Sequence, residues 1–338
     1  MTTKLPLPRV RQLLSAFNRA RVTVLGDVML DQFLWGSVAR LSPEAPVPVV
    51  EFERESFIPG GAGNVARNLA HLRANAELLS VTGDDAAARQ LRQLLSDDGV
   101  ACSNVVACSN RVTSVKTRIV AERQQVVRVD RESRGDIEAK TADRLLAALA
   151  QSLQHADALI LGDYAKGVIS QPLLDQIRRL CRARGVWLSM DPKPAHSLNL
   201  AGLSLLTPNR REAFALAGLP DESHRVEPSH DAALHRVADK LLAELQPALL
   251  LITLGEHGML LCQRGQKPFH VPTAAREVFD VSGAGDTVIA SFTLAIVAGA
   301  SPVEAAFFSN HAAGVVVGKL GTATVTPDEL LASFPGEP

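Results

Sequence analysis

The chain has 338 residues, of which 46% are hydrophobic and 21% charged, and its formal net charge is -1. This composition excludes global disorder, and the lack of a basic block argues against nucleic acid or a membrane as a partner. The four cysteines form no Cys-x-x-Cys pair, and the N-terminus has prolines where a signal peptide would have an apolar core. We therefore expect a cytoplasmic protein with reduced thiols.

The first predicted element is a β-branched run at residues 21–27, which is typical of a buried strand and ends in Gly-Asp. Residues 32–60 and 112–130 follow a different pattern, in which apolar residues alternate with charged residues, glycine or proline. These two segments predict strand-rich excursions that pair into a small accessory sheet.

The rest of the chain alternates between strand and helix patterns. Strands are predicted at 77–82, 158–162, 186–190, 203–206 and 248–253, and helices at 62–72, 85–95, 137–153, 171–182, 210–217, 231–245, 284–297 and 302–317. Strands separated by helices favour an α/β fold with a doubly wound, mostly parallel sheet and helices on both faces.

The strongest chemical signal is the run Asp280-Val-Ser-Gly-Ala-Gly-Asp286 before an apolar helix. Gly283 and Gly285 let the backbone approach a ligand closely, and the N-terminus of the helix directs free N–H groups at an anion. A carboxylate there is useful if Asp286 removes the proton of a hydroxyl while the N–H groups steady developing charge. The alternative is that Asp286 only caps the helix.

A second glycine-rich run is Pro59-Gly60-Gly61-Ala-Gly63-Asn64. As text it matches a dinucleotide fingerprint, but such a fingerprint belongs in the turn after the first strand, which here ends at Asp27. We interpret the run as a loop where the backbone and Asn64 approach a polyhydroxylated ligand. Asp27 and Asp31, after the first strand, are candidates to accept hydrogen bonds from vicinal hydroxyls, with helix capping or solvation as the alternative for Asp31.

Three further sets of residues are candidates for binding phosphate or metal. Asn209 and Glu212 share a helix face, so they could hold Mg²⁺ through water, form a capping box, or do both. Lys193 follows a strand, where it serves either as a point charge for phosphate or as an ordinary surface lysine. Lys116, Arg118 and Arg128 in the second excursion could meet an anionic group on the substrate.

No Walker A sequence and no protein-kinase motif set occurs in the chain. The two glycine loops, in this order, resemble the signatures of the ribokinase-like (PfkB) carbohydrate kinase family over residues 15–333. The resemblance implies an α/β ribokinase-like fold, with residues 1–338 as one kinase domain and the segments near 32–60 and 111–130 as a small β-sheet lid. It also implies a homodimer formed through the lid.

Carried over by position, the resemblance implies that Asp286 is the base and that the N–H groups of Gly283, Ala284, Gly285 and Asp286 form an anion hole. It implies that sugar hydroxyls are held by Asp27, Asp31, Gly60, Gly61 and Asn64, and phosphate by Lys193. It implies that Asn209 and Glu212 order Mg²⁺ and the ATP phosphates. It also implies that the nucleotide wall, the surface against which the nucleotide of ATP lies, is formed by Thr253, Gly255, Gly258 and Asn310. A monovalent cation such as K⁺ would lie near Asp280, Ser282 and residues 319–322.

Within the family, residues 26–31, 41–49, 163–167, 206–209 and 313–322 resemble the branch that phosphorylates a heptose 7-phosphate. The sequence ends at Pro338 and has no His-x-Gly-His motif, so we expect the kinase without the adenylyltransferase that some members carry. The alternatives are another ribokinase-like sugar kinase, a nucleotide-binding oxidoreductase, and a sugar-binding regulator without activity. The retained Asp286 argues against the last, because a binding protein needs no base.

Overall fold

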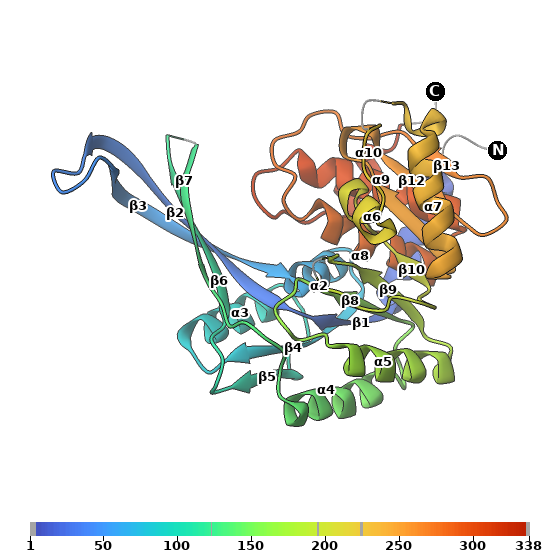
Figure 1. The fold of residues 1–338 in the computed structure, drawn as a ribbon, viewed down its shortest axis with the longest axis horizontal. Helices are drawn as coiled ribbons and strands as arrows, with labels where there is room; N and C mark the ends of the chain where they lie inside the picture. The colour runs from blue at the N-terminus through green and yellow to red at the C-terminus, as the bar shows by residue number, and fades with distance from the viewer. Residues whose placement is uncertain (1–4, 123, 195, 224–225, 336–338) are drawn as a thin grey trace.

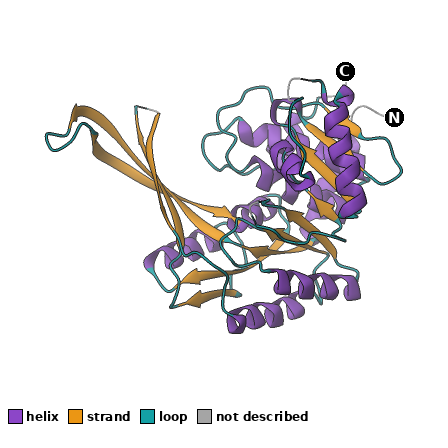
Figure 2. Ribbon diagram, in the orientation of Figure 1, coloured by secondary structure: helices purple, strands orange, loops and turns teal. Residues whose placement is uncertain are grey.

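Two β-sheets form the framework of the protein, a sheet of nine strands and a sheet of four (Figures 1 and 2). The computed structural model describes residues 5–122, 124–194, 196–223 and 226–335. In this part of the chain no helix combines the length and the apolar character needed to cross a bilayer.

The nine-stranded sheet has the order β13-β12-β11-β10-β9-β8-β1-β4-β5. The strands from β11 to β5 pair in parallel, whereas β12 and β13 add an antiparallel edge. The prediction of a mostly parallel sheet is therefore confirmed. The bounds are β1 Arg21–Gly26, β4 Asn75–Gly83, β5 Val105–Cys108, β8 Ala158–Gly162, β9 Trp187–Asp191, β10 Leu205–Leu206, β11 Leu249–Thr253, β12 Met259–Cys262 and β13 Phe269–Val271.

Helices cover both faces of this sheet, so its strands are buried on both sides. Along β1, Val24 belongs to one apolar cluster and Leu25 to the other. The first cluster joins α1, α2, α3, α8, α9 and α10, and the second joins α4, α5, α6 and α7. The helices are α1 Leu7–Ala16, α2 Ala62–His71, α3 Ala86–Asp97, α4 Ala139–Ser152, α5 Gln171–Arg184, α6 Arg210–Ala217, α7 Ala232–Glu244, α8 Ala284–Val297, α9 Pro302–Val317 and α10 Pro327–Ser333.

The four-stranded sheet, which we call the lid sheet, has the order β3-β2-β6-β7 and projects from the body (Figure 1). Its strands are β2 Val28–Leu41, β3 Pro48–Gly61, β6 Ser114–Ala121 and β7 Gln124–Arg131. The predicted pairing of the two excursions is confirmed. Burial along β2 falls from its buried start to its exposed tip, so the base of the lid sheet belongs to the body and the tip does not.

Several elements were absent from the sequence prediction. These are α1, β5, the hairpin of β12 and β13, and α10. Prolines stand in the first turns of α1 and α10, where they are tolerated because the first N–H groups of a helix lack intrahelical partners. The three strands have three or four residues each, too few to show a periodic pattern.

Candidate active site

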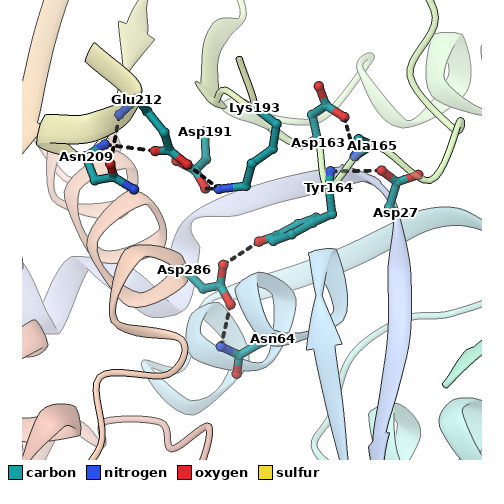
Figure 3. Close-up of polar contacts among 10 residues, drawn as sticks. All are labelled: Asp27, Asn64, Asp163, Tyr164, Ala165, Asp191, Lys193, Asn209, Glu212 and Asp286. Carbon is teal, nitrogen blue, oxygen red and sulfur yellow. Dashed lines mark hydrogen bonds and ion pairs between the residues drawn. The ribbon is translucent and has the colours of Figure 1, made fainter. Parts of the chain in front are cut away.

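Acidic side chains gather where three parallel strands of the large sheet end. Asp27 follows β1, Asp163 follows β8, and Asp191 is the last residue of β9. Because these strands are neighbours in the sheet, their carboxyl ends lie at one edge, and the N-terminus of α8 meets them there (Figure 3). The predicted site therefore lies where ligands bind in open α/β sheets.

Asp286 lies in the first turn of α8 with 8% of its surface exposed. Asn64 of α2 donates a hydrogen bond from Nδ2 to Oδ2 of Asp286 over 2.8 Å, and the hydroxyl of Tyr164 donates to Oδ1 (Figure 3). The Asn64 side chain is fully buried in the first turn of α2, where its amide binds the Asp286 carboxylate. That Asn64 also holds a sugar hydroxyl stays a prediction.

Burial raises the pKa of the Asp286 carboxyl, and the hydrogen bonds from Tyr164 and Asn64 together with the charge of Lys193 oppose that rise. A carboxylate with a raised pKa is a stronger base than one in water. The residue before α8 is Gly283, which has no side chain to cap the helix, and Asp286 is the third residue of the helix. The hydrogen bonds to the Asp286 carboxylate described above come from other segments of the chain.

Gly283 precedes α8 with φ of 79° and with little space around it. A Cβ at this position would lie 2.7 Å from Nδ2 of Asn64 and 2.7 Å from Cγ2 of Thr322. A Cβ on Gly285 would meet nothing within 4 Å. The glycines thus differ: Gly283 is required by the fold, whereas Gly285 leaves open space beside the first N–H groups of α8, which lack intrahelical partners.

The Asp27 side chain is held by backbone groups of the chain itself, and its contact with a sugar stays a prediction. Asp27 is 1% exposed, and its carboxylate accepts three backbone N–H groups: those of Tyr164 and Lys166 at Oδ2, over 2.9 and 3.0 Å, and that of Val168 at Oδ1, over 2.9 Å. A carboxylate after a buried strand needs partners, and the chain itself supplies them. Asp27 therefore fixes the loop that carries Tyr164.

We expect Asp27→Asn to lower the free energy of unfolding by about 1–3 kcal/mol, because the side-chain NH₂ would face N–H groups and leave a buried donor unsatisfied. Urea unfolding followed by circular dichroism measures the change. Asp239→Asn, on the exposed face of α7, is the matched control. Equal stability of the two variants would contradict the anchoring role.

Asp31 is 5% exposed at the base of the lid sheet, where Nη1 of Arg118 donates to its Oδ1 over 2.6 Å. Gly60 backs this carboxylate, since a Cβ there would collide with Oδ2. Arg118 and Arg128 are directly paired on β6 and β7, but the Arg128 guanidinium binds Asp130 over 2.8 and 3.0 Å. The structure thus brings Arg118 to the site and leaves Arg128 at the exposed edge of the lid sheet.

Lys193 lies between two carboxylates. Its Nζ donates to Oε1 of Glu212 over 2.6 Å and lies 3.7 Å from Oδ2 of Asp191 (Figure 3). Burial raises the pKa of Asp191 to about 7, although Lys193 opposes the rise. Burial lowers the pKa of the Lys193 ammonium, but the carboxylates of Asp191 and Glu212 outweigh this effect, so that the pKa is raised. Lys193 therefore stays charged at this edge of the sheet.

Asn209 and Glu212 form the capping box of α6. Oδ1 of Asn209 accepts the N–H of Glu212 over 2.9 Å, and Oε2 of Glu212 accepts the N–H of Asn209 over 2.9 Å. Since Oε1 of Glu212 also binds Lys193, both oxygens of this carboxylate are engaged. Within the described ranges, no three His, Cys, Asp or Glu side chains group as metal ligands, so this donor set fits Mg²⁺ only through water.

Two cavities flank the loop 280–286. The first, which we call the lid cleft, has a volume of about 850 Å³ and lies between Phe33, Trp35 and Arg118 of the lid sheet and Asp280, Ser282 and Thr322. The second, the Thr253 pocket, has a volume of about 550 Å³, and its lining includes Ala284 and Gly285 together with Thr253, Gly255, Gly258 and Asn310. The four residues predicted for the nucleotide wall are thus brought together.

Asp280 joins the two loops where a monovalent cation was expected. Its Oδ1 accepts the N–H of Ser282 over 2.8 Å, and its Oδ2 accepts the N–H of Gly321 over 3.1 Å. One lone pair on each oxygen remains for a cation, so the donor set fits K⁺, whose binding here stays a prediction.

Tyr164 and Asp191 are two side chains of the site that were not predicted from the sequence. Both stand at the carboxyl end of a predicted strand, in the stretches Asp163-Tyr164 and Asp191-Pro-Lys193. That position was the available signal, because neighbouring parallel strands deliver their last residues to the same edge.

Comparison with known proteins identifies the family of the chain. Residues 19–329 match the family described as pfkB family carbohydrate kinase. The chain belongs to the pfkB family of carbohydrate kinases. The expected family is thereby confirmed, and the motifs at Asn64 and Asp286 both lie within the matched region.

Two relatives of this pfkB family member are each named Bifunctional protein HldE. That of Caulobacter sp. (strain K31) is 45% identical over 322 residues, which are 95% of this chain and 64% of the relative. That of Shigella boydii serotype 18 is 45% identical over 318 residues, 94% of this chain and 64% of the relative. The chain thus spans less than two thirds of the length of these relatives.

Solved structures confirm the ribokinase-like fold. Phosphofructokinase-2 from Escherichia coli in complex with potassium superposes with a TM-score of 0.76 at 21% identity, covering 93% of this chain and 97% of that one. Arabidopsis thaliana ribokinase complexed with ribose and ATP gives a TM-score of 0.74 at 20% identity, covering 93% and 98%.

Proposed function

We propose that this pfkB family member is an ATP-dependent sugar kinase in which Asp286 is the general base. The observation that carries the proposal is the loop 280–286, which borders both cavities and ends at a buried carboxylate. Its Asp280 side lines the lid cleft and its Gly285 side lines the Thr253 pocket. A sugar in the first and a nucleotide in the second would meet at the N-terminus of α8.

In the proposed step, a carboxylate oxygen of Asp286 accepts the proton of the sugar hydroxyl. The hydroxyl oxygen forms a bond to the γ-phosphorus of ATP, the bond from that phosphorus to the bridging oxygen breaks, and ADP leaves. The first N–H groups of α8 stabilise the charge on the phosphoryl oxygens. Mg²⁺ held through water by Asn209 and Glu212 would neutralise phosphate charge, and Lys193 would add a positive charge nearby.

We propose D-glycero-β-D-manno-heptose 7-phosphate as the substrate, phosphorylated at the C1 hydroxyl to the 1,7-bisphosphate, a precursor of ADP-heptose for the lipopolysaccharide core. The five sequence stretches named above and the relatives named HldE support this choice. The alternative is another sugar or sugar phosphate.

The charges of the lid sheet support a phosphorylated substrate. Burial lowers the pKa of the Lys116 ammonium, Asp31 opposes this, and the positive charges of Lys166, Arg118 and Arg128 lower it further. Such crowded cations repel one another, and a phosphate dianion between them would relieve the repulsion. We therefore propose that Lys116 and Arg118, with Arg128 at the edge, receive the 7-phosphate.

The remaining parts of the proposal concern assembly and place. Residues 1–338 act as one cytoplasmic kinase domain, which dimerises through the lid sheet. Exposed apolar side chains on the lid sheet, at Phe52, Val127 and Val129, support an interface there.

An ADP-release assay with Mg²⁺-ATP tests the function. It compares the heptose 7-phosphate with ribose, fructose and fructose 6-phosphate. Turnover with the heptose phosphate alone is the expected result. Turnover with a different sugar would keep the kinase and discard the substrate, and hydride transfer to NAD in place of ADP release would discard both.

Arg118→Gln is expected to raise KM for the sugar phosphate about 10- to 100-fold and to leave KM for ATP unchanged, because one charge-assisted hydrogen bond to phosphate is lost. Steady-state kinetics with each substrate varied in turn measure both constants. Arg40→Gln, at the exposed tip of β2, is the control. A similar KM in the two variants would remove Arg118 from the phosphate site.

A further inference from the structure

We infer that Tyr164 is a positioning residue that, together with Asn64, sets the orientation of the Asp286 carboxylate for proton transfer. The inference rests on the proposed function and assigns a role to a side chain outside the predicted site. The two donors bind different oxygens: the Tyr164 hydroxyl binds Oδ1, and the Asn64 amide binds Oδ2 over 2.8 Å (Figure 3).

The ring of Tyr164 is seated on glycines. A Cβ on Gly61 would lie 3.3 Å from Cδ2 of the ring, and a Cβ on Gly162 would lie 3.2 Å from Cε2. Nζ of Lys193 is 5.8 Å from the ring centroid. A side chain on Gly61 or Gly162 would press on the ring, so these glycines make room for the phenol. The predicted approach of Gly61 to a sugar stays a prediction.

The backbone of Tyr164 is also fixed. Its N–H donates to Oδ2 of Asp27 over 2.9 Å. The next residue, Ala165, has φ of 56°, and Gly167 has φ of 87° at a point where a Cβ would collide with the Gly135 carbonyl. A left-handed alanine costs about 1–2 kcal/mol, and the surrounding contacts maintain it. The loop therefore holds the phenol in one place before substrate arrives.

The charges around the pair determine the direction of the hydrogen bond. Burial, with the charges of Asp286 and Asp191, raises the pKa of Tyr164 well above its ordinary value, so the phenol keeps its proton and donates it to the carboxylate. The groups that act on Asp286 are Tyr164, Asn64, Lys193 and, as like charges, Asp31 and Asp191.

Two fixed donors leave each carboxylate oxygen one lone pair, and they favour the ionised form of Asp286. Removal of the Tyr164 hydroxyl would raise the pKa of Asp286. Asp286 would then take up a proton, and cease to act as a base, at a higher pH. The acidic limb of the pH profile of kcat would therefore shift to higher pH. Misalignment would lower kcat itself.

A different role is conceivable from the same contact, namely that the Tyr164 hydroxyl occupies the place of the substrate hydroxyl and leaves when sugar binds. That role predicts the opposite kinetics: without the hydroxyl, KM for the sugar falls and kcat stays the same. The two roles are therefore distinguished by one variant.

The kinetic test is Tyr164→Phe, which removes the hydroxyl and keeps the ring next to Gly61 and Gly162. We expect kcat to fall about 10- to 100-fold, KM for ATP to stay within about twofold, and the acidic limb of kcat to shift to higher pH. Circular dichroism and thermal unfolding verify the fold. An unchanged kcat and acidic limb, or a lower KM for the sugar at full kcat, would overturn the inference.

A second test needs no substrate, because Tyr164 is the only tyrosine of the chain. Tyrosine labelled with ¹³C at Cζ gives a single resonance, which we expect to shift as Asp286 and Asp191 gain protons on acidification. Asp286→Asn should remove the Asp286 part of this titration, whereas Asp239→Asn should leave the curve unchanged. If the titration curve of the Tyr164 resonance in Asp286→Asn coincides with the wild-type curve, the inference is wrong. Loss of the Asp286 part without turnover on any sugar would instead retain the contact and refute the proposed function.

Discussion

Replacement of Asp286 by asparagine is expected to lower kcat by about 10³- to 10⁴-fold while ATP and sugar still bind. Asparagine keeps the size of the side chain in the first turn of α8, but its amide accepts no proton from a hydroxyl. Single-turnover kinetics measure the chemical step, and calorimetric titration measures binding of each substrate.

Asp239→Asn, which removes a carboxylate from the exposed face of α7, is the control for this experiment and should keep full activity. Normal turnover of Asp286→Asn would mean that Asp286 only caps α8, and the proposed mechanism would be wrong. The pH dependence of kcat in the wild-type enzyme is a further test. Because burial raises the pKa of Asp286, kcat should fall as the pH drops through that raised pKa.

Gly283→Ala is expected to lower kcat about 100-fold and to destabilise the protein by about 1–2 kcal/mol. The backbone there has φ of 79°, which disfavours any side chain, and the added Cβ would press on both Asn64 and Thr322 at 2.7 Å. The loop must move to relieve these contacts, and the first N–H groups of α8 would move with it. Urea unfolding and steady-state kinetics measure the two effects.

Gly285→Ala is the matched control for stability. A Cβ at Gly285 meets nothing within 4 Å, and the residue lies inside α8, where alanine is favoured over glycine. We expect unfolding of this variant at the wild-type urea concentration or above it. If Gly283→Ala were equally stable, the tight packing around Gly283 would not constrain the loop.

The sequence predicted the scaffold of the site well, because periodic apolar patterns are local. The ranges of β8, α6, α8 and α9 agree with the predicted segments, and Asp286 lies at the predicted helix N-terminus. The partners of each polar group were harder to predict, since they depend on which segments meet in space. Asp27 is the example: its position after a strand was clear, but the three N–H groups that occupy it come from residues 164–168.

Asn64 and Tyr164 are two further residues whose contacts could not be predicted from the sequence. The glycines before Asn64 led to the prediction that it binds sugar, which no observation tests, but they gave no sign that its amide binds Asp286. Tyr164 had no motif spacing to mark it, and it reaches the base because α8 packs against β8, the strand that Tyr164 follows. The side chains were visible in the sequence, and the contacts between them were not.

The base and its two donors are far apart in the chain: Asn64 and Asp286 are 222 positions apart, and Tyr164 and Asp286 are 122 positions apart. Closing such long loops is entropically costly and occurs late, after local helices and hairpins have formed. During refolding from denaturant, secondary structure should therefore recover before enzyme activity. A nascent chain that still lacks α8 would contain every strand from β1 to β13 but no base. The enzyme therefore stays inactive until synthesis has passed the last of the three segments.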